Sequence, residues 1–258
     1  MRKKVDFLVL GSGIAGLSYA LKVADYGKVL VIAKGKLDET ATRYAQGGIA
    51  AVTYNPDNFE KHIRDTIDAG DKLSDDDIVK MTIYEAPERI RELVHWGVRF
   101  DRNTDGLYEL GREGGHSEKR VLHHKDRTGF EIQQALLNAS RMHPNIEVAE
   151  GHFSVDIITQ HHLGMKVTRR TPEVTCYGAY ILNPEQRKVY TVLARCTMLA
   201  TGGAGNIYSS TTNPLINTGD GVAMLYRAKG AVEKMEFVQF HPTSLYNPGE
   251  TPSFLITE

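Results

Sequence analysis

The N-terminal part of the chain contains two short apolar runs, separated by a glycine-rich turn and a helical pattern. Val5–Leu10 and Lys28–Ala33 are largely apolar runs of strand length, and Leu17–Ala24 between them has helical spacing. Continuous apolar runs are typical of strands buried on both faces. A strand, a helix and a second strand within about thirty residues form the βαβ unit of a parallel sheet. The pattern therefore predicts a doubly wound α/β fold.

Two helices are predicted in the next part of the chain. Asp57–Ala69 is amphipathic and ends at Gly70, and Ser74 is placed to cap a second helix whose first turn is acidic. Acidic residues are favourable there because the N-terminus of a helix carries a positive partial charge. Proline lacks a backbone N–H and clashes with the preceding turn. We therefore expect the second helix to break near Pro87 and to resume through Trp96.

The hydrophobic period changes in the second half of the chain. Residues 147–197 contain short runs of alternating apolar and polar positions, which are typical of antiparallel strands. Cys196–Ala204 returns to a continuous apolar strand that ends in glycines, and a helix follows that closes at Gly230. We predict a Rossmann-like α/β domain over residues 1–235, with an antiparallel β-meander inserted at about 147–197.

Composition limits the partners and the location of the protein. The 258 residues include 31 basic and 32 acidic side chains, so no basic surplus favours nucleic acid or an anionic membrane as a partner. Cys176 and Cys196 lie far apart and outside any metal-ligand spacing, which fits a reduced, cytoplasmic protein, and we predict no metal site. No apolar stretch reaches membrane-spanning length. The chain stops within an apolar, strand-like run, so we expect it to be truncated.

The segment GSGIAG joins the first predicted strand to the first predicted helix. The first glycine permits a tight turn, the second lets a pyrophosphate approach the backbone, and the third lets the helix pack on the strand. A dinucleotide site is therefore predicted, with a glycine turn that binds no ligand as the simpler alternative. The next strand ends in Ala33-Lys34-Gly35 rather than in the acid that binds the ribose of NAD. NAD therefore loses support, and Lys34 is predicted to face adenosine or phosphate.

Three further segments carry candidate ligand contacts. Gln46–Gly48 allows a flat ligand to approach, with the amide as a polar anchor, although a plain turn has the same spacing. Thr201–Gly203 closes a strand at the edge where doubly wound sheets bind ligands. Asp220 is by default a helix N-cap and alternatively an acceptor for ribose or ribityl hydroxyls.

Two histidine-containing segments leave their roles open. Gly111–His124, GREGGHSEKRVLHH, is too charged and glycine-rich for a core. Adjacent histidines on a strand point to opposite faces, which disfavours a zinc site at its end. A solvated loop and a turn that approaches a ligand at the paired glycines both remain open. His241, between Gln239 and Pro242, is either a structural histidine or one held for a ligand.

The order of these motifs resembles that of the succinate dehydrogenase/fumarate reductase flavoprotein family, and in particular of its aspartate-oxidising branch. The resemblance is carried by GSGIAGLS, AQGGIAA, REGGHS, RVLHHKDRTG, ATGGAGNIY, TNPLINTGDGVAM and QFHPTSLY, which span nearly the whole chain. It implies an FAD-binding domain over residues 1–235 and the start of a capping domain at 236–258. Succinate-oxidising relatives carry a flavin-linked histidine at about the position of Ala41 and a phenylalanine at that of Glu113. The resemblance therefore implies non-covalent FAD, and a Glu113 carboxylate that pairs with the amino group of aspartate.

The resemblance also assigns the site residues. Together with the motif positions above, it places FAD at Gly11, Ser12, Gly13, Ile14, Ala15, Gly16, Lys34, Ala41, Thr42, Arg43, Tyr44, Ala45, Gln46, Gly47, Gly48, Thr201, Gly202 and Asp220. The substrate is assigned to Glu113, Gln239, His241, Thr257 and Glu258.

The implied activity is FAD-dependent oxidation of L-aspartate to iminoaspartate, with oxygen, giving hydrogen peroxide, or fumarate as the electron acceptor. The resemblance also implies that this reaction is the first step of de novo NAD biosynthesis, with a functional link to quinolinate synthase. Family members use arginines that would lie beyond Glu258, so we expect the chain alone to be inactive or nearly so. A soluble fumarate reductase-like flavoprotein and a non-catalytic nucleotide-binding module are the alternatives.

Overall fold

The helices and strands of the chain belong to two compact units. The computed structural model describes residues 2–241, 243–247, 249, 253 and 255–256. The first unit comprises Met1–Arg43 and Leu137–Glu258, and the second comprises Tyr44–Leu136. The domain boundary that we predict at 235/236 differs from this division and stays a prediction.

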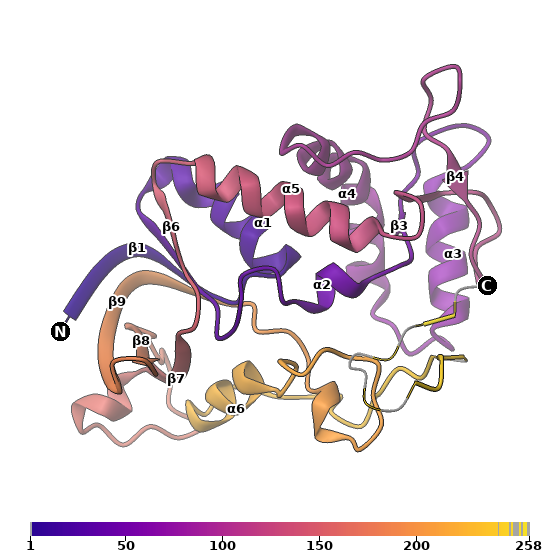
Figure 1. The fold of residues 1–258 in the computed structure, drawn as a ribbon. Coiled ribbons are helices and arrows are strands. Elements are labelled where there is room, and N and C mark those ends of the chain that lie inside the picture. The colour runs from indigo at the N-terminus through magenta and orange to yellow at the C-terminus, as the bar shows by residue number, and fades with distance from the viewer. Residues whose placement is uncertain (1, 242, 248, 250–252, 254, 257–258) are drawn as a thin grey trace. The chain divides into compact units, whose positions relative to one another are not determined.

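A six-stranded sheet forms the centre of the first unit (Figure 1). Its strands, in spatial order, are β6 (Ile146–Ala149), β2 (Val29–Ile32), β1 (Arg2–Leu10), β9 (Lys188–Leu199), β8 (Gly178–Asn183) and β7 (Phe153–Ile158). The β6-β2-β1-β9 part is parallel, and the β9-β8-β7 part is antiparallel. The predicted α/β class, with a parallel sheet and an antiparallel meander, is confirmed.

Strand β9 belongs to both parts of this sheet. The alternating run before Thr197 and the apolar run after it form one strand, which pairs with β8 along one edge and with β1 along the other. The change from alternating to continuous apolar positions near Thr197 therefore does not mark the end of a strand. It reflects different surroundings along the same strand. Residues 147–149, predicted as the start of the meander, belong instead to β6, parallel to β2.

Helices and short 3₁₀ segments complete the first unit. They are α1 (Ile14–Val23), η1 (Ala24–Tyr26), η2 (Gln160–Leu163), η3 (Gly205–Ile207) and α6 (Asp220–Arg227). Helix α1 packs against β1 and β2, and α6 packs against β7. The buried side chains include Leu8, Leu30, Ile181 and Met224. Both central strands, β1 near its end and β2 throughout, are buried, as their continuous apolar runs predict.

Close backbone contacts explain two glycines at the turn from β1 into α1. Gly11 has φ +117°, and a Cβ there would lie 2.1 Å from the carbonyl oxygen of Ala200. A Cβ on Gly16 would lie 2.1 Å from the carbonyl oxygen of Gly11. A side chain at either position would overlap backbone, so the turn requires glycine at both.

The second unit contains two longer helices and a small antiparallel sheet. The helices are α3 (Phe59–Ala69) and α4 (Asp76–His95), which pack together, and the sheet has the order β3 (Ile49–Ala50), β5 (Val121–Leu122) and β4 (Leu110–Gly111). Two further helices, α2 (Ala41–Tyr44) and α5 (Thr128–Met142), each contain a boundary between the units.

Helix α4 begins with a different cap from the one predicted. The side chain of Asp75, not that of Ser74, accepts hydrogen bonds from the backbone N–H groups of Asp77 at 3.0 Å and Ile78 at 3.1 Å. Both residue types are good caps, and three aspartates follow Ser74, so composition alone could not fix the first turn.

The predicted break near Pro87 is wrong. Helix α4 runs without interruption from Asp76 to His95, with Pro87 inside it. Ile83, Ile90 and Leu93, on both sides of the proline, are buried. Burial of this apolar face offsets the loss of one backbone hydrogen bond at the proline.

Candidate functional site

The first unit contains a cavity of about 220 Å³ where its parallel strands end. The ends of β1 and β2 and the residues after β9 contribute to its wall. Open α/β sheets bind ligands at the carboxyl ends of their strands. Predicted site residues in the wall are Gly11, Ser12, Gly13, Ile14, Ala15, Lys34, Ala41, Thr42, Thr201, Gly202 and Asp220. Segments that are far apart in the sequence thus line one cavity.

An ion pair forms the charged part of the cavity wall. Lys34 Nζ lies 2.7 Å from Asp220 Oδ2 and donates to Thr218 Oγ1 at 2.6 Å. Thr218 also donates to Asp220 Oδ1 at 2.7 Å. The positive charge of Lys34 is therefore compensated within the protein. The group offers a ligand both hydrogen-bond donors and acceptors.

Asp220 is not the N-cap of α6. The N-cap is Gly219, which has φ +73°, and Asp220 is the first residue of the helix. Its carboxylate is directed to Lys34 and Thr218 rather than to the helix backbone, so the default interpretation of Asp220 as a cap is wrong. A left-handed conformation at the cap position favours glycine, which explains why the acid follows the cap.

Ser12 and Thr42 hold the loop after β2 beside the start of α1. Ser12 is buried and its hydroxyl donates to the carbonyl oxygen of Leu37 at 2.8 Å. Thr42 Oγ1 accepts the N–H of Ile14, the first residue of α1, at 3.0 Å. A Cβ on Gly13 would lie 3.3 Å from the same hydroxyl. These two side chains therefore shape the cavity from within the protein.

Several residues in the wall were not predicted from the sequence. They are Gly35, Lys36, Glu39, Thr40, His152, Ser154, Ile216 and Asn217, with four apolar positions at or just after the strand ends, Leu10, Ile32, Ala33 and Ala200. Glu39 and Thr40 directly precede the segment from Ala41, so extending that segment upstream would have included them. His152 directly precedes β7 and Ser154 is its second residue, and no sequence signal placed that strand beside the cavity.

In the second unit, Glu113 contacts the Gln46–Gly48 turn. Glu113 Oε1 lies 3.3 Å from the backbone N of Gly48, which donates to it, and the side chain of Glu113 is otherwise exposed. A Cβ on Gly48 would lie 2.2 Å from the carbonyl oxygen of Leu122, so the backbone of β5 packs directly against this turn. Gln46 Oε1 is buried and has no hydrogen-bond partner among the described residues. The turn thus carries a buried acceptor that is unpaired among the described residues, and one of its N–H groups contacts an exposed carboxylate.

The paired glycines after Glu113 belong to a tight turn. Gly115 has φ +83°, and a Cβ on Gly114 would meet no atom within 4 Å. Backbone conformation therefore accounts for Gly115. The approach of a ligand to these glycines stays a prediction.

The two adjacent histidines at the end of this segment do not point to opposite faces. His123 Nδ1 lies 3.2 Å from Asp101 Oδ2, and His124 Nδ1 lies 3.5 Å from Asp101 Oδ1. Strand β5 ends at Leu122, so the alternation of a strand does not apply to them. The Lys125 N–H, hydrogen-bonded to Asp101, and the two histidines hold the pKa of that carboxyl below its usual range. This group fixes the chain after β5.

The remaining predicted residues make other contacts. Arg43 forms an ion pair with Asp38, and the carbonyl oxygen of Ala45 accepts the N–H of Gly129 at 2.9 Å. Gln239 and His241 are exposed, and His241 Nδ1 lies 2.8 Å from the carbonyl oxygen of Thr243. Thr257 and Glu258 lie outside the described residues. The joint action of Glu113, Gln239 and His241 on one substrate stays a prediction.

Comparison with protein families decides the assignment. The FAD binding domain family matches residues 6–258. The chain belongs to this FAD-binding family. The family assignment confirms FAD as the cofactor, and the structure fits a dinucleotide. Gly11 and Gly13, at the start of α1, line the cavity together with the Lys34–Asp220 pair.

Individual relatives point to a narrower group within this family. The chain is 48% identical, over 98% of its length, to L-aspartate oxidase 2-a, chloroplastic, from Nicotiana tabacum, and the match covers 39% of that protein. It is 45% identical, again over 98% of its length, to L-aspartate oxidase from Vibrio cholerae, with 47% of that protein covered. The chain thus spans about two fifths to one half of the curated relatives that it matches.

Solved structures give the same family. The FAD-binding fold superposes on E. coli quinol fumarate reductase FrdA with a TM-score of 0.88 at 32% identity, covering 100% of this chain and 42% of that one. Against Mycobacterium smegmatis Sdh1 the TM-score is 0.85 at 31% identity, covering 99% and 43%. The resemblance to the succinate dehydrogenase/fumarate reductase flavoproteins is confirmed. Within the described ranges, no helix combines the length and hydropathy that a bilayer crossing requires.

Proposed function

We propose that the protein carrying this chain oxidises L-aspartate to iminoaspartate with non-covalent FAD. The electrons pass to oxygen, giving hydrogen peroxide, or to fumarate. The proposal is supported by identity of up to 48% with proteins named L-aspartate oxidase, over nearly the whole chain. The reaction would open de novo NAD biosynthesis in the cytoplasm, with quinolinate synthase consuming the imine. The plant relatives are named as chloroplastic proteins, so the cytoplasmic location is proposed for this protein and not for them.

The observation that carries the choice of substrate is the position of Glu113. Its exposed carboxylate accepts the N–H of Gly48, on a turn that also contains Gln46 Oε1, a buried acceptor with no partner among the described residues. A fixed carboxylate attracts an ammonium group through charge-assisted hydrogen bonds. Succinate and fumarate have no amino group, so they gain nothing from this contact.

Hydrogen-bond donors are needed at the carboxylates of the substrate. Gln239 and His241 are exposed and carry such donors, and the hydroxyl of Thr257 is the third donor of the predicted set, with Glu258 as its neighbour in the chain. The N–H of Thr243 donates to His241 Nδ1 at 3.3 Å, and in the tautomer that accepts this bond Nε2 carries the proton and can donate to a substrate carboxylate. We propose that these groups orient aspartate, so that the bound flavin accepts a hydride from it.

The proposed cofactor ligands are those of the predicted set. Gly11–Ala15 and the start of α1 suit the pyrophosphate, Lys34 suits adenosine or phosphate, and Asp220 suits ribose or ribityl hydroxyls. Gln46 Oε1 suits a ring N–H of the flavin, because it is a buried acceptor without a partner among the described residues. Ala41 has no nucleophile, so FAD would be held without a covalent bond.

The substitution Glu113→Gln tests the assignment in the complete protein that carries this sequence. It keeps the shape of the side chain and removes the charge. We expect kcat/KM for L-aspartate oxidation to fall about 10- to 100-fold, the value of a hydrogen bond to a charged group. Fumarate reduction should stay within about twofold of the unchanged protein, because fumarate lacks the amino group.

Glu109→Gln is the matched control, because Glu109 is an exposed glutamate of the same unit. It should leave both activities unchanged. Equal losses of aspartate oxidation and fumarate reduction in Glu113→Gln would contradict the assigned role.

A fumarate reductase is the second candidate, favoured by the superposition on quinol fumarate reductase FrdA. Such a protein would reduce fumarate and release no peroxide with L-aspartate. A protein that takes up no FAD and shows no flavin absorbance would instead indicate a nucleotide-binding module without catalysis.

A further inference from the structure

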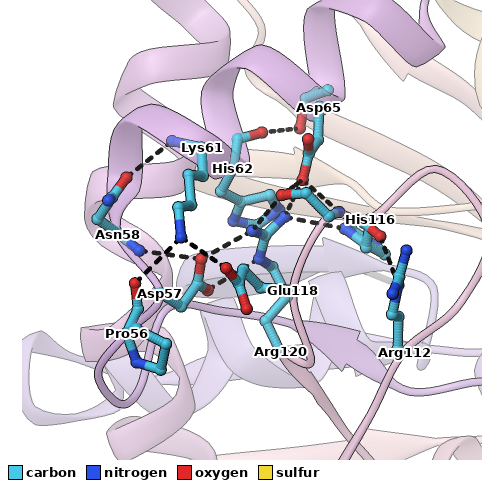
Figure 2. Close-up of polar contacts among 12 residues, drawn as sticks. Pro56, Asp57, Asn58, Lys61, His62, Asp65, Arg112, His116, Glu118 and Arg120 are labelled. Atoms are coloured by element: carbon cyan, nitrogen blue, oxygen red, sulfur yellow. Dashed lines mark hydrogen bonds and ion pairs between the residues drawn. The ribbon is translucent and has the colours of Figure 1, made fainter.

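The segment that carries Glu113 ends at Arg120, whose side chain is completely buried between two aspartates (Figure 2). Arg120 Nε and Nη2 donate to the two oxygens of Asp57 at 2.9 and 2.7 Å. Its Nη1 lies 2.5 Å from Asp65 Oδ2, on helix α3. The guanidinium therefore joins the Glu113 segment to α3 and to the chain before it.

Partners favour the charged forms of Arg120 and Asp65 although burial opposes them. Burial acts to lower the pKa of Arg120, but hydrogen bonds and the negative charges of Asp57 and Asp65 outweigh it and raise that pKa. Burial likewise opposes ionisation of Asp65, but hydrogen bonds from Ser117 and Arg120 hold its pKa below the usual range. A buried ion network is tolerated only when its members are all paired, and removal of one member is strongly destabilising.

The network also holds the turn that follows Glu113. The N–H and the hydroxyl of Ser117 both donate to Asp65 Oδ2 at 2.8 Å. Arg120 Nη1 lies 3.3 Å from His116 Nδ1. Residues 116 and 117 are therefore fixed to α3 and to the guanidinium.

Short contacts connect this anchor to Glu113 itself. The N–H of His116 donates to the carbonyl oxygen of Glu113 at 3.3 Å, which closes the turn. The Arg112 guanidinium donates to the carbonyl oxygen of His116 at 2.9 Å. Glu113 and the residue before it, Arg112, are thus both hydrogen-bonded to His116. The position of His116 therefore fixes the position of Glu113.

The backbone of Arg120 fixes the opposite side of the contact. Its N–H donates to the carbonyl oxygen of Gly111 at 3.1 Å, and its carbonyl oxygen accepts the N–H of Ala51 at 3.0 Å. Gly111 precedes Glu113, and Ala51 follows the turn at Gly48. One residue thus holds both the segment of Glu113 and the turn whose N–H the carboxylate accepts.

We propose that Arg120, paired with Asp57 and Asp65, is a positioning residue that sets the Glu113 carboxylate for recognition of the substrate amino group. This inference rests on the proposed function of Glu113. Arg120 itself does not touch the substrate, since its side chain is wholly buried and each of its three nitrogens is bonded within the protein. The network acts through the turn at residues 113–116.

Asp65→Asn is the most informative substitution. It weakens the bonds to Arg120 and Ser117 while the two bonds from Arg120 to Asp57 remain. Arg120→Ala, in contrast, would leave the buried Asp57 carboxylate without a charged partner and would be strongly destabilising. Kinetics are measured on the complete, FAD-loaded protein for the unchanged chain, Asp65→Asn, Glu113→Gln and the double variant.

We expect Asp65→Asn to lower kcat/KM for aspartate about tenfold, mainly through KM, as for coupled neighbours. Fumarate reduction should change by less than about twofold. In the Glu113→Gln background, Asp65→Asn should have no further effect on aspartate oxidation, because the carboxylate that it positions is already gone. A merely structural role would lower both activities equally and in both backgrounds.

Arg89→Gln provides a matched control, because it removes an ion pair of the same unit, Arg89–Glu92 at 2.9 Å, within α4. It should leave the ratio of the two activities unchanged. If Asp65→Asn does not fold, Ser117→Ala enters the same cycle, because it removes the hydroxyl contact and leaves the ion pairs intact.

The outcomes separate the two proposals. An unchanged protein that binds FAD but does not oxidise aspartate rejects the proposed function, and the positioning role with it. An unchanged protein that oxidises aspartate, but with additive effects of Asp65→Asn and Glu113→Gln, rejects the positioning role alone.

Discussion

At the scale of single residues, Gly11 combines a structural need with the candidate FAD site. Its φ of +117° and the 2.1 Å that would separate a Cβ from the carbonyl oxygen of Ala200 exclude a side chain. We expect Gly11→Ala to lower the free energy of unfolding by about 2–3 kcal/mol and to abolish flavin binding. Urea unfolding and flavin absorbance measure the two effects.

Gly203→Ala is the control for this substitution. Gly203 lies in the loop after β9, its φ is not in the left-handed region, and a Cβ would meet no atom within 4 Å. Stability should change by less than about 0.5 kcal/mol, with flavin binding retained. Similar losses in both variants would contradict the explanation for Gly11.

His62 makes stability depend on pH. Burial, followed by the positive charges of Arg120 and His116, lowers the pKa of His62 to about 4, whereas Asp57 and Asp65 act in the opposite sense. The unfolded chain takes up the proton near pH 6.5 and the folded chain only near pH 4. Stability is therefore lost as pH falls through this window, with a slope of at most about 1.4 kcal/mol per pH unit from this group.

We expect His62→Gln to flatten the pH dependence of the unfolding free energy between about pH 4 and 6.5. Urea unfolding at several pH values measures this slope. His95→Gln, at an exposed histidine of the same unit, should keep the slope of the unchanged chain. An equal slope in His62→Gln would show that the buried histidine is not its source.

At the scale of elements, the start of α4 depends on one side chain. Asp75 accepts two backbone N–H groups, whereas Ser74 stands one position earlier. We expect Asp75→Ala to lower the free energy of unfolding by about 1 kcal/mol and Ser74→Ala to change it by less than about 0.5 kcal/mol. Urea unfolding distinguishes them, and the reverse order would restore Ser74 as the cap.

The sequence predicted those elements whose pattern is local. Continuous apolar runs identified β1 and β2, and the glycine spacing between them identified the turn into α1. The continuity of α4 through Pro87 was not predictable, because it depends on burial of Ile83 and Ile90. Strands of two residues, such as β3, have no period to detect.

In the candidate site, too, only the parts with a local sequence signal were predicted. Motif spacing indicated Gly11–Gly16 and the Gln46–Gly48 turn, and the family resemblance singled out Glu113. The network around Arg120 was missed, because its partners Asp57 and Asp65 are distant in the sequence and no local pattern joins them.

At the scale of the whole molecule, the chain contains an FAD-binding fold and spans 39–47% of the L-aspartate oxidases described above. We propose that the complete protein uses this fold to oxidise an amino acid rather than succinate. Rejection of a substrate that leaves a fixed polar group unpaired can be large, about 10⁴-fold in well-built sites.

Peroxide release by the complete, FAD-loaded protein, with L-aspartate and with succinate as alternative substrates, tests this claim most directly. We expect peroxide with L-aspartate in proportion to the imine formed, and a kcat/KM for succinate lower by at least about 10²-fold. Equal peroxide release with both substrates, or none with L-aspartate from a protein that shows flavin absorbance, would contradict it.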